Sequence, residues 1–295
     1  MAITFKGIVP ALITPMTRDE EIDEPGLRTL VDRLIDAGVH GLFVLGTNGE
    51  FIALSDEEKV RIARIAVDQA RGRVPVIAGT GAYATRDVIA LNGRMQDAGV
   101  DAVSVITPYF NGATQQELFA HYERIARATS LPVMLYTIPA KAGVTLSVET
   151  VRRLAEIPNI RGIKDSGGDF DRLLQLINLR RDDFAVFTGT DSMILWTLIA
   201  GGDGAVAATT NAVPSVVMSI WNNFQAGDLA AARRAQESLR PLRDAFALGT
   251  LPVVLKEAAD ILGMPAGPAR APAQPLDAAA RDRLLKALAI YPRVS

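Results

Sequence analysis

Three side chains of the 295-residue sequence have the types needed for amine-based carbonyl chemistry: Lys164, Tyr136 and Thr47. Lys164 ends the run Ile160–Lys164, in which the alternation of a strand places Gly162 and Lys164 on the same face. A lysine amine withdrawn from water is nucleophilic toward ketones, whereas an arginine guanidinium is not. Because the small Gly162 leaves room beside the lysine stem, we expect a partly desolvated amine. A lysine paired with a carboxylate at a strand end is the alternative interpretation.

Tyr136 and Thr47 supply the hydroxyl groups that such chemistry requires. Tyr136 ends the run Pro132–Tyr136, which directly precedes the lysine strand in sequence order, so its phenol is expected to reach the Lys164 amine. A tyrosine can relay protons while a carbinolamine forms and loses water, given a second hydroxyl such as that of Thr47. Asn48 and its flanking glycines predict a turn whose backbone N–H groups suit a carboxylate. Packing at a strand end and a simple turn are the alternatives here.

The elements that must position these residues alternate regularly along the chain. Short β-branched apolar runs are followed by longer stretches of helical period, which is the pattern of βα units around a parallel sheet. Eight βα units close into a TIM (β/α)8 barrel, whereas a doubly wound sheet usually has five or six strands, so we predict the barrel. Its active site lies where the strands end. The predicted strands are Gly7–Ile13, Gly41–Val44, Pro75–Ala78, Ala102–Ile106, Pro132–Tyr136, Ile160–Lys164, Ala185–Thr188 and Gly204–Ala207.

The helical stretches complete this architecture. Ser55 followed by Glu58 forms a capping box before one of them. After Pro214 the strand signals stop and the chain becomes alanine-rich, with further helices expected near 228–246, 251–262 and 277–289. We therefore divide the chain into a barrel of residues 1–225 and a C-terminal helical extension of residues 226–295 packed on it. The barrel helices are expected near Gly26–Ala37, Asp56–Arg71, Thr85–Ala98, Gln115–Ala128 and Ser147–Glu156.

Composition excludes several classes of function. With 49% hydrophobic and 22% charged residues the chain can bury a large core, and 31 basic against 33 acidic residues leave no surplus for a phosphate backbone. The absence of cysteine excludes disulfides and thiolate nucleophiles, and the two distant histidines, His40 and His121, make a metal site unexpected. We expect no nucleic-acid partner, no signal peptide, no membrane span and a cytoplasmic location.

One local pattern offers a different chemistry. Residues 79–84, Gly-Thr-Gly-Ala-Tyr-Ala, follow a predicted strand and precede a predicted helix, which nearly satisfies the dinucleotide-binding fingerprint. The pattern sits on the third strand of eight, and Asp97 and Asp101 fit the expected acidic position only loosely. We therefore expect no nicotinamide and no other cofactor.

Together these motifs resemble the pyruvate-dependent class I aldolases and synthases related to dihydrodipicolinate synthase and N-acetylneuraminate lyase. The resemblance runs nearly end to end and reaches the helical tail. It rests on Phe5-Lys6-Gly7-Ile8, Thr14-Pro15, Gly46-Thr47-Asn48-Gly49-Glu50, Thr107-Pro108-Tyr109, Tyr136-Thr137-Ile138-Pro139 and Ile163-Lys164-Asp165-Ser166.

The resemblance implies roles for individual residues. Lys164 would form a Schiff base with a 2-keto acid, normally pyruvate, while Tyr136 would move protons to and from the substrate. Thr47 and the Asn48 backbone would bind the keto-acid carboxylate. The pyruvate pocket would be lined by Gly189 and Val206. Family members are commonly homotetramers in which the loop after the fourth strand reaches into a neighbouring subunit's site, so a homo-oligomer is expected.

Three positions depart from the synthase pattern. Synthases typically have two tyrosines after the fourth strand's proline, and the second completes the hydroxyl relay, whereas here Tyr109 is followed by Phe110. Tyr109 remains a candidate for binding substrate, but the relay hydroxyl is missing at Phe110. After the fifth strand Thr137 replaces an asparagine and Lys141 replaces an arginine. A lysine still pairs with a carboxylate but lacks the bidentate fork.

Three segments look closer to the 4-hydroxy-2-oxoglutarate aldolase branch, which yields pyruvate and glyoxylate, or to a 2-keto-3-deoxy acid aldolase: Lys164–Asp169, Gly46–Phe51 and the late motif Gly267–Pro272 around Arg270. Ser166 and Lys141 would then contact the second fragment, an aldehyde. Three alternatives stay open: a 4-hydroxy-tetrahydrodipicolinate synthase joining pyruvate to aspartate semialdehyde, a dehydratase of 2-keto-3-deoxy sugar acids, and a non-catalytic keto-acid-binding barrel. Because an iminium stores the electron pair as an enamine, none of the enzymatic readings requires a metal.

Overall fold

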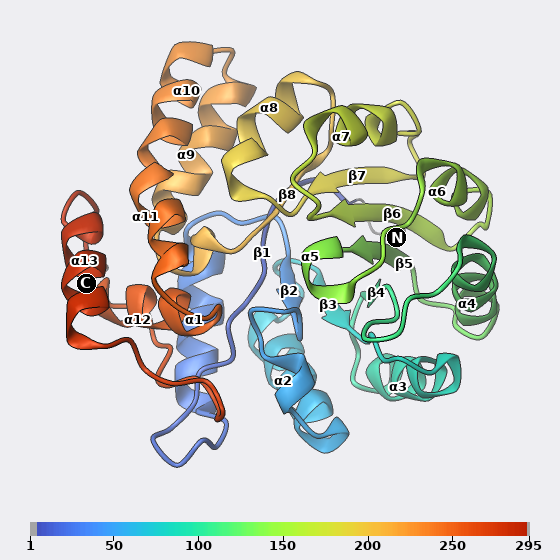
Figure 1. Ribbon diagram of the computed structural model, residues 1–295, viewed down its shortest axis with the longest axis horizontal. Helices are drawn as coiled ribbons and strands as arrows, with labels where there is room; N and C mark the ends of the chain where they lie inside the picture. Colours follow the sequence, from blue (N-terminus) through green and yellow to red (C-terminus); the bar gives the residue numbers. More distant parts are fainter. Residues whose placement is uncertain (1–4, 294–295) are drawn as a thin grey trace.

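The strands form one eight-stranded parallel sheet in the computed structural model, which describes residues 5–293. Neighbouring strands pair in the order β1-β8-β7-β6-β5-β4-β3-β2. The predicted TIM barrel is confirmed, and Figure 1 shows helices surrounding the strands. The strands are β1 (Gly7–Pro10), β2 (Leu42–Val44), β3 (Val76–Gly79), β4 (Ala102–Ile106), β5 (Val133–Thr137), β6 (Ile160–Asp165), β7 (Ala185–Thr188) and β8 (Gly204–Ala207).

The first strand is shorter than predicted because the chain changes partner after Pro10. Up to that residue β1 pairs with β8 in parallel register, Gly7 opposite Gly204. Beyond it, Ala11 forms an isolated bridge with Phe43, and the Leu12 amide donates to the Phe43 carbonyl. This bridge joins the first strand to β2 and completes the ring.

Two layers of apolar side chains make up the core. The inner layer fills the barrel itself, as alternate residues of parallel strands must. The outer layer lies between the strands and the helices and includes fully buried residues such as Leu30 and Tyr122. Lys164 therefore sits on a face whose other members exclude water. The inner layer consists of Phe5, Val9, Ala11, Phe43, Ile77, Ala102, Met134, Ala185, Phe187 and Val206.

Local signals in the sequence set the helix boundaries. The Ser55–Glu58 capping box is present at the start of the second helix, and a second capping box links Thr114 and Glu117. The helices of the barrel are α1 (Glu24–Asp36), α2 (Asp56–Ala70), α3 (Thr85–Asp97), α4 (Gln115–Arg127), α5 (Pro139–Ala142), α6 (Val148–Leu154), α7 (Phe170–Ile177), α8 (Ile194–Ile199) and α9 (Pro214–Gln225). Short 3-10 turns cover Phe51–Ala53, Asp191–Met193 and Thr209–Asn211.

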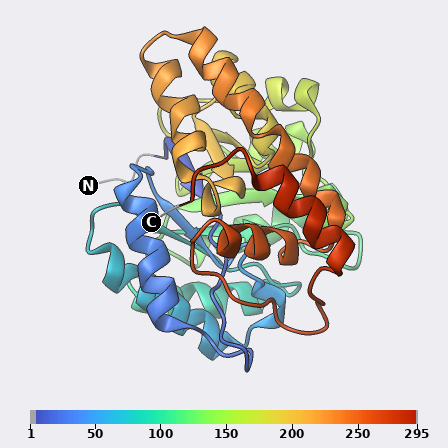
Figure 2. The same cartoon turned by 90° about the vertical axis from the view of Figure 1, so that its left-hand side faces the viewer.

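The C-terminal helices lie on one side of the barrel, orange to red in Figures 1 and 2, beside α1. They are α10 (Leu229–Ser238), α11 (Arg240–Ala245), a 3-10 turn at Phe246–Leu248, α12 (Val253–Ile261) and α13 (Ala278–Leu288). The single helix predicted for 228–246 is wrong: it is two helices, and Pro241 stands in the first turn of the second, where its missing N–H costs nothing.

The division into two domains stays a prediction. The boundary at residue 225 coincides with the end of α9, but α10 packs directly against α9 across it. Among residues 5–293 no helix combines the length and apolarity needed to cross a membrane.

Candidate active site

Two neighbouring strands bring Lys164 and Tyr136 together. Tyr136 on β5 is paired in register with Lys164 on β6. The Lys164 Nζ lies 4.1 Å from the centroid of the Tyr136 ring and 4.8 Å from that of Phe43. The Tyr136 hydroxyl is in turn 3.1 Å from the Thr47 Oγ1, at the end of β2. The three residues expected to carry the chemistry thus form one connected group.

Lys164 is buried, with 4% of its surface exposed, and its neighbours are aromatic rings rather than carboxylates. Within residues 5–293 no ion pair involves it. The adjacent Asp165 points away, because one carboxylate oxygen accepts from the Arg172 Nε at 2.9 Å and the other from the Gly167 amide. An amine held against ring faces, without a carboxylate, keeps its lone pair available once deprotonated.

Gly189 provides the space beside the lysine stem. A Cβ at this position would lie 2.8 Å from the Lys164 Cε and 1.9 Å from the Ser166 Oγ. Gly162, which was expected to leave this room, has a different role: a Cβ at this position would lie 2.7 Å from the Ala185 carbonyl oxygen of β7. Gly162 is therefore needed for the close approach of two strands.

Hydrogen bonds within the turn and from Thr14 hold the turn that carries Thr47. Its Gly49 amide donates to the Gly46 carbonyl, and the Thr14 hydroxyl donates to the Gly49 carbonyl at 2.8 Å. Asn48 is buried within the turn. Glu50 closes the turn with a left-handed backbone (φ 59°), which a non-glycine residue adopts only where its surroundings hold it there.

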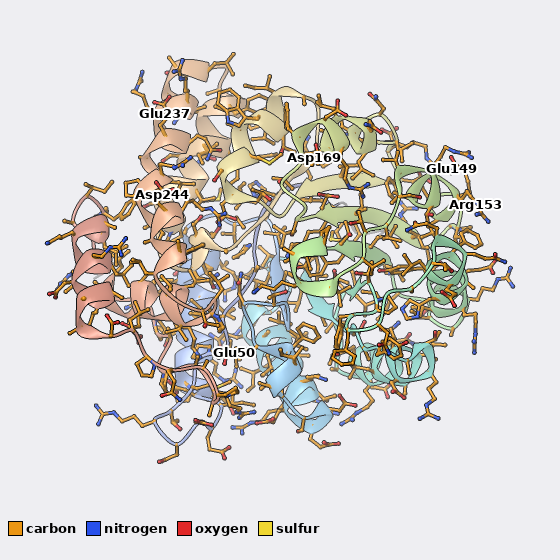
Figure 3. The ribbon with its side chains drawn as sticks, in the orientation of Figure 1. Glu50, Glu149, Arg153, Asp169, Glu237 and Asp244 are labelled. Carbon is orange, nitrogen blue, oxygen red and sulfur yellow. The ribbon has the colours of Figure 1, made fainter. Side chains whose placement is uncertain are left out.

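The residues that hold Glu50 come from the C-terminal extension, and this role was not predicted from the sequence. The Lys256 Nζ donates to one oxygen of Glu50 at 2.8 Å, and the Arg270 amide donates to the other at 2.8 Å. The Arg270 guanidinium also binds Glu58 through two hydrogen bonds and lowers the pKa of that carboxyl. Figure 3 labels Glu50, which lies near the red C-terminal chain. The only sequence signal was the motif around Arg270, noted for the family resemblance alone.

The remaining predicted residues surround this group at different depths. Tyr109 is half-buried and packs edge-on against Phe51, with ring centroids 5.9 Å apart, and burial raises the pKa of its phenol. Phe110 beside it is 95% exposed with a φ of 80°. Lys141 is exposed on α5, whereas Val206 is buried on β8. Ser166 follows β6 and meets Gly189, as described above.

The near-match to a dinucleotide fingerprint has a packing explanation. A Cβ at Gly79 would lie 2.2 Å from the Leu45 carbonyl oxygen, and one at Gly81 would lie 2.2 Å from the Ile106 side chain. Both glycines are thus required by neighbouring strands. The histidines are held by local bonds: His40 accepts from the Ile8 amide, and His121 is bonded to Thr85. In the part of the chain that the structure describes, no cluster of three or more His, Asp or Glu side chains could hold a metal.

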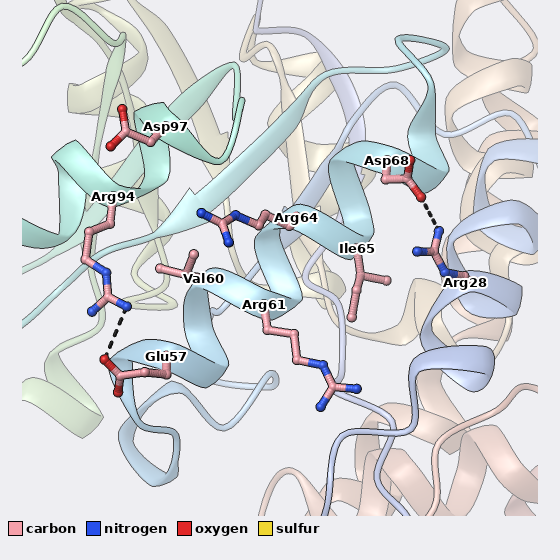
Figure 4. A pocket seen from close by; sticks show the side chains of 9 residues that line it. All are labelled: Arg28, Glu57, Val60, Arg61, Arg64, Ile65, Asp68, Arg94 and Asp97. Carbon is pink, nitrogen blue, oxygen red and sulfur yellow. Dashed lines mark hydrogen bonds and ion pairs between the residues drawn. The ribbon is translucent and has the colours of Figure 1, made fainter.

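Another cavity lies away from the strand ends. It measures about 440 Å³ and crosses the outer surfaces of α1, α2 and α3 (Figure 4). Its arginines are largely engaged, since Arg28 pairs with Asp68 and Arg94 with Glu57. Seven of its nine lining residues are charged, whereas small-molecule sites are mostly apolar, so this groove is not a candidate active site.

Comparison with known proteins identifies the family to which the chain belongs. Residues 4–290 match the family model described as the dihydrodipicolinate synthetase family. The chain belongs to this family. It is 41% identical over 291 residues to 4-hydroxy-tetrahydrodipicolinate synthase of Thermomicrobium roseum, covering 99% of this chain and 96% of that one. It is 39% identical to the Methanopyrus kandleri protein of the same name, over 92% of this chain and 91% of that one.

Solved structures of the family superpose closely. A dihydrodipicolinate synthase from Bacillus anthracis gives a TM-score of 0.95 at 37% identity, covering 99% of this chain and all of that one. YagE, a prophage protein of E. coli K12 in the same family, solved in complex with pyruvate, gives 0.92 at 38% identity over 97% and 99% of the two chains. As a family member, this chain is an enzyme of the lyase class, of the Schiff-base aldolase type.

Proposed function

We propose that this enzyme binds pyruvate as a Schiff base on Lys164 and joins it to, or releases it from, an aldehyde. The observation that carries the proposal is the position of the Lys164 amine, buried against Phe43 and Tyr136 with no ion pair in residues 5–293. The hydrogen-bonded hydroxyls of Tyr136 and Thr47 beside it supply a proton path. The pyruvate complex of the related YagE supports pyruvate as the keto acid.

The chemistry follows from these positions. The neutral Lys164 amine attacks the C2 ketone, and loss of water gives an iminium, with Tyr136 passing protons to and from Thr47. In the cleavage direction Tyr136 accepts the proton of the C4 hydroxyl as the bond between C3 and C4 breaks. The electron pair of that bond is stored as an enamine, and the turn at Thr47 and Asn48 holds the carboxylate.

Two aldehydes are candidates for the second partner. The relatives named 4-hydroxy-tetrahydrodipicolinate synthase favour aspartate semialdehyde, the alternative of the sequence analysis, over its first choice, the cleavage of 4-hydroxy-2-oxoglutarate. That first choice, which releases glyoxylate, keeps a specific observation in its favour. Phe110 offers no relay hydroxyl, and Lys141 stands where synthases have an arginine.

Trapping with borohydride tests the Schiff base directly. The enzyme is incubated with pyruvate and borohydride, and peptide mass spectrometry locates the reduced adduct. An adduct on Lys164 supports the proposal, and incubation with aspartate semialdehyde or glyoxylate then ranks the two candidates by rate. No adduct with pyruvate or any other 2-keto acid contradicts the proposal and favours a binding barrel without turnover. Product analysis with 2-keto-3-deoxy sugar acids separates the dehydratase alternative.

A second test concerns the proton path. Tyr136→Phe removes the phenol hydroxyl while keeping the ring that faces Lys164, so turnover should fall by roughly 10² to 10⁴ with the fold intact. Thr47→Val, which removes the partner hydroxyl, should produce a smaller loss in the same step. Normal turnover in Tyr136→Phe would remove this residue from the mechanism.

The proposal includes a homo-oligomer, a dimer or a tetramer. Large apolar side chains are exposed on two separate faces: Tyr83 and Phe110 on the loops after β3 and β4, and Trp196 and Ile199 on α8. Single exposed residues are ordinary, but paired groups of this kind are typical of subunit contacts. Sedimentation analysis of the intact enzyme, with Phe110→Ser and Trp196→Ser as variants, tests each face. A cytoplasmic location stays a prediction.

A further inference from the structure

Strands β7 and β8 share few backbone pairs where they approach the site. Their register ends with the pair formed by Thr188 and Ala205. The next residues along the two chains are Gly189 and Val206, which the family resemblance places in the wall of the keto-acid pocket. Because the pairing stops just before these two residues, some other contact must fix the distance between them.

Gly189 is fixed on the side of the reactive lysine. Its amide donates to the carbonyl of Asp165, the residue directly after Lys164, at 2.7 Å. A Cβ on Gly189 would lie 2.8 Å from the Lys164 Cε, so this backbone is close to the lysine stem. The position of Gly189 therefore limits the room beside whatever carbon the Lys164 amine binds.

Asp191 links the ends of the two strands beyond their last backbone pair. It lies two residues after Gly189 and is 1% exposed. Its two carboxylate oxygens accept the amides of Ala208 and Thr209, at 3.2 and 2.6 Å. Since Ala208 is only two residues beyond Val206, this contact joins the two halves of the pocket wall.

The charge of the Asp191 carboxylate makes the link specific. Within residues 5–293 no cation pairs with it, and its contacts are the two backbone amides. Burying a carboxylate costs free energy unless hydrogen bonds replace its water. Hydrogen bonds to an ionised acceptor are about twice as strong as those between neutral groups. The arrangement in which both amides point at the carboxylate is therefore strongly favoured over any other spacing of the strand ends.

The C-terminal extension holds Asp191 from the outer side. Gln236 of α10 is buried, and its side-chain nitrogen donates to the Asp191 carbonyl at 2.9 Å. Its side-chain oxygen accepts the Leu195 amide, also at 2.9 Å. Helix α10 packs against α8 and α9, the helices that follow β7 and β8 (Figure 1). The extension thus contacts the pocket wall through a single glutamine.

We propose that Asp191 is a positioning residue that sets the keto-acid specificity of this enzyme, and that Gln236 supports it. The inference rests on the proposed pyruvate Schiff base at Lys164. With Asp191 in place, the wall formed by Gly189 and Val206 stays at one distance from the bound C2 carbon. It then accepts the methyl group of pyruvate better than the ethyl group of 2-oxobutanoate. Asp191 acts through the backbone and not on the reacting atoms.

The rate of adduct formation without any aldehyde measures the keto-acid side alone. The enzyme is incubated with pyruvate or 2-oxobutanoate and borohydride, and mass spectrometry follows each reduced adduct with time. The native enzyme should react about tenfold or more faster with pyruvate, because one methylene in a fitted pocket changes such rates about 10–200-fold. The ratio of the two rates is the readout, since a smaller folded fraction lowers both rates equally and leaves the ratio unchanged.

Two variants test the link and its support. Asp191→Asn keeps the size of the side chain but replaces one accepting oxygen by an NH₂ group, which cannot accept the second amide. We expect the pyruvate to 2-oxobutanoate ratio to fall about three- to tenfold, because the strand ends are no longer held at one distance. Gln236→Met removes only the contact from α10 and should lower the ratio by a smaller factor.

Asp203→Asn is the matched control. Asp203 is also buried, and its carboxylate also accepts a backbone amide, that of Val186, at 2.9 Å. It pairs in addition with Arg180, so its loss should destabilise the fold at least as much. Because Asp203 directly precedes β8, it lies at the opposite end of the strands from the site. Asp203→Asn should leave the ratio of the two rates at its native value.

A lower ratio in Asp191→Asn and Gln236→Met, with the native ratio in Asp203→Asn, supports the inference. A native ratio in Asp191→Asn, or equal rates with both keto acids in the native enzyme, overturns it and leaves the proposed function standing. The same fall in all three variants also overturns it, because it would show a general disturbance of the barrel. If Asp191→Asn does not fold, Gln236→Met decides by the same ratio. Failure of the native enzyme to form any adduct overturns the proposed function and this inference with it.

Discussion

Lys164 and Lys256 are both buried lysines, 4% and 1% exposed, yet they stand in opposite surroundings. Lys256 is bonded to the Glu50 carboxylate and the Pro268 carbonyl, so its charge is matched. Burial lowers the pKa of its amine, and Glu50 opposes that shift. Lys164 lies against two aromatic rings. The difference teaches that burial alone does not mark a reactive lysine: it is the lack of a carboxylate partner that leaves an amine free to react.

The largest effect expected from this comparison is on turnover. Lys164→Met should abolish it, by roughly 10⁴-fold or more, because the covalent nucleophile is lost. Its stability in urea should equal or exceed that of the native enzyme, because an apolar side chain replaces an amine that has no ion pair in residues 5–293. Pyruvate formation and urea unfolding measure the two quantities. Schiff-base formation at another lysine in this variant would contradict the view that Lys164 is the reactive lysine.

The same substitution at the second lysine should have its main effect on stability. Lys256→Met leaves the buried Glu50 carboxylate without its cation, which costs about 3–5 kcal/mol in the free energy of unfolding. Glu50→Gln combined with Lys256→Met should recover part of that loss. Lys59→Met is the matched control, because its partner Asp56 is 51% exposed and such a pair contributes about 1 kcal/mol or less. Equal losses of unfolding free energy in Lys256→Met and Lys59→Met would contradict the assignment of Lys256 as the counter-ion that Glu50 requires.

His121 extends the comparison to a buried base with no charged partner. Burial lowers its pKa to about 4, from the ordinary 6.5, and its Nε2 has no hydrogen-bond partner in residues 5–293. Between these values the unfolded chain binds a proton that the folded one does not, so stability is present above pH 6.5 and is lost as the pH falls toward 4. The loss amounts to about 3 kcal/mol.

A single variant measures how much of the stability loss at acid pH comes from His121. His121→Gln keeps a hydrogen-bonding group for Thr85 but does not titrate in this range. The difference in unfolding free energy between the native enzyme and the variant should shrink or reverse between pH 7 and pH 4, as followed by urea titration at each pH. A constant difference across that range would show that His121 does not carry the acid sensitivity.

The smallest effect concerns the outer end of the Glu50 network. Arg270→Lys keeps the charge but loses the two-pronged contact with Glu58, at a cost of about 1–2 kcal/mol. The backbone amide that binds Glu50 is unchanged, so turnover should fall less than in Lys256→Met. A larger stability loss in Arg270→Lys than in Lys256→Met would reverse the order of importance proposed for the two cations.

Much of the barrel could be predicted because its signals are local. Strand positions follow from short β-branched runs, and Ser55 with Glu58 marks a helix start without reference to the rest of the chain. The break near Leu239 was missed because a proline in the first turn of a helix is compatible with helix on both sides. The early end of β1 was missed because it depends on where β2 lies.

The same distinction applies to the site. Lys164 and Tyr136 could be placed together because adjacent parallel strands put their ends side by side. Gly189 was found only through the family resemblance, and the network of Glu50, Lys256 and Arg270 was not found at all. The contacts of Glu50 with Lys256 and Arg270 join residues more than two hundred positions apart, and no periodic pattern in the sequence carries that information.

The contact between Glu50 and Lys256 also has a consequence for the order of synthesis. The two residues are 206 positions apart, so a ribosome adding about 5–20 residues each second needs about 10–40 s to make the second after the first. Throughout that interval the Glu50 carboxylate, at the end of the turn that carries Thr47, lacks the Lys256 amine as its counter-ion. The turn therefore gains this counter-ion only after α12, which carries Lys256, has been synthesised.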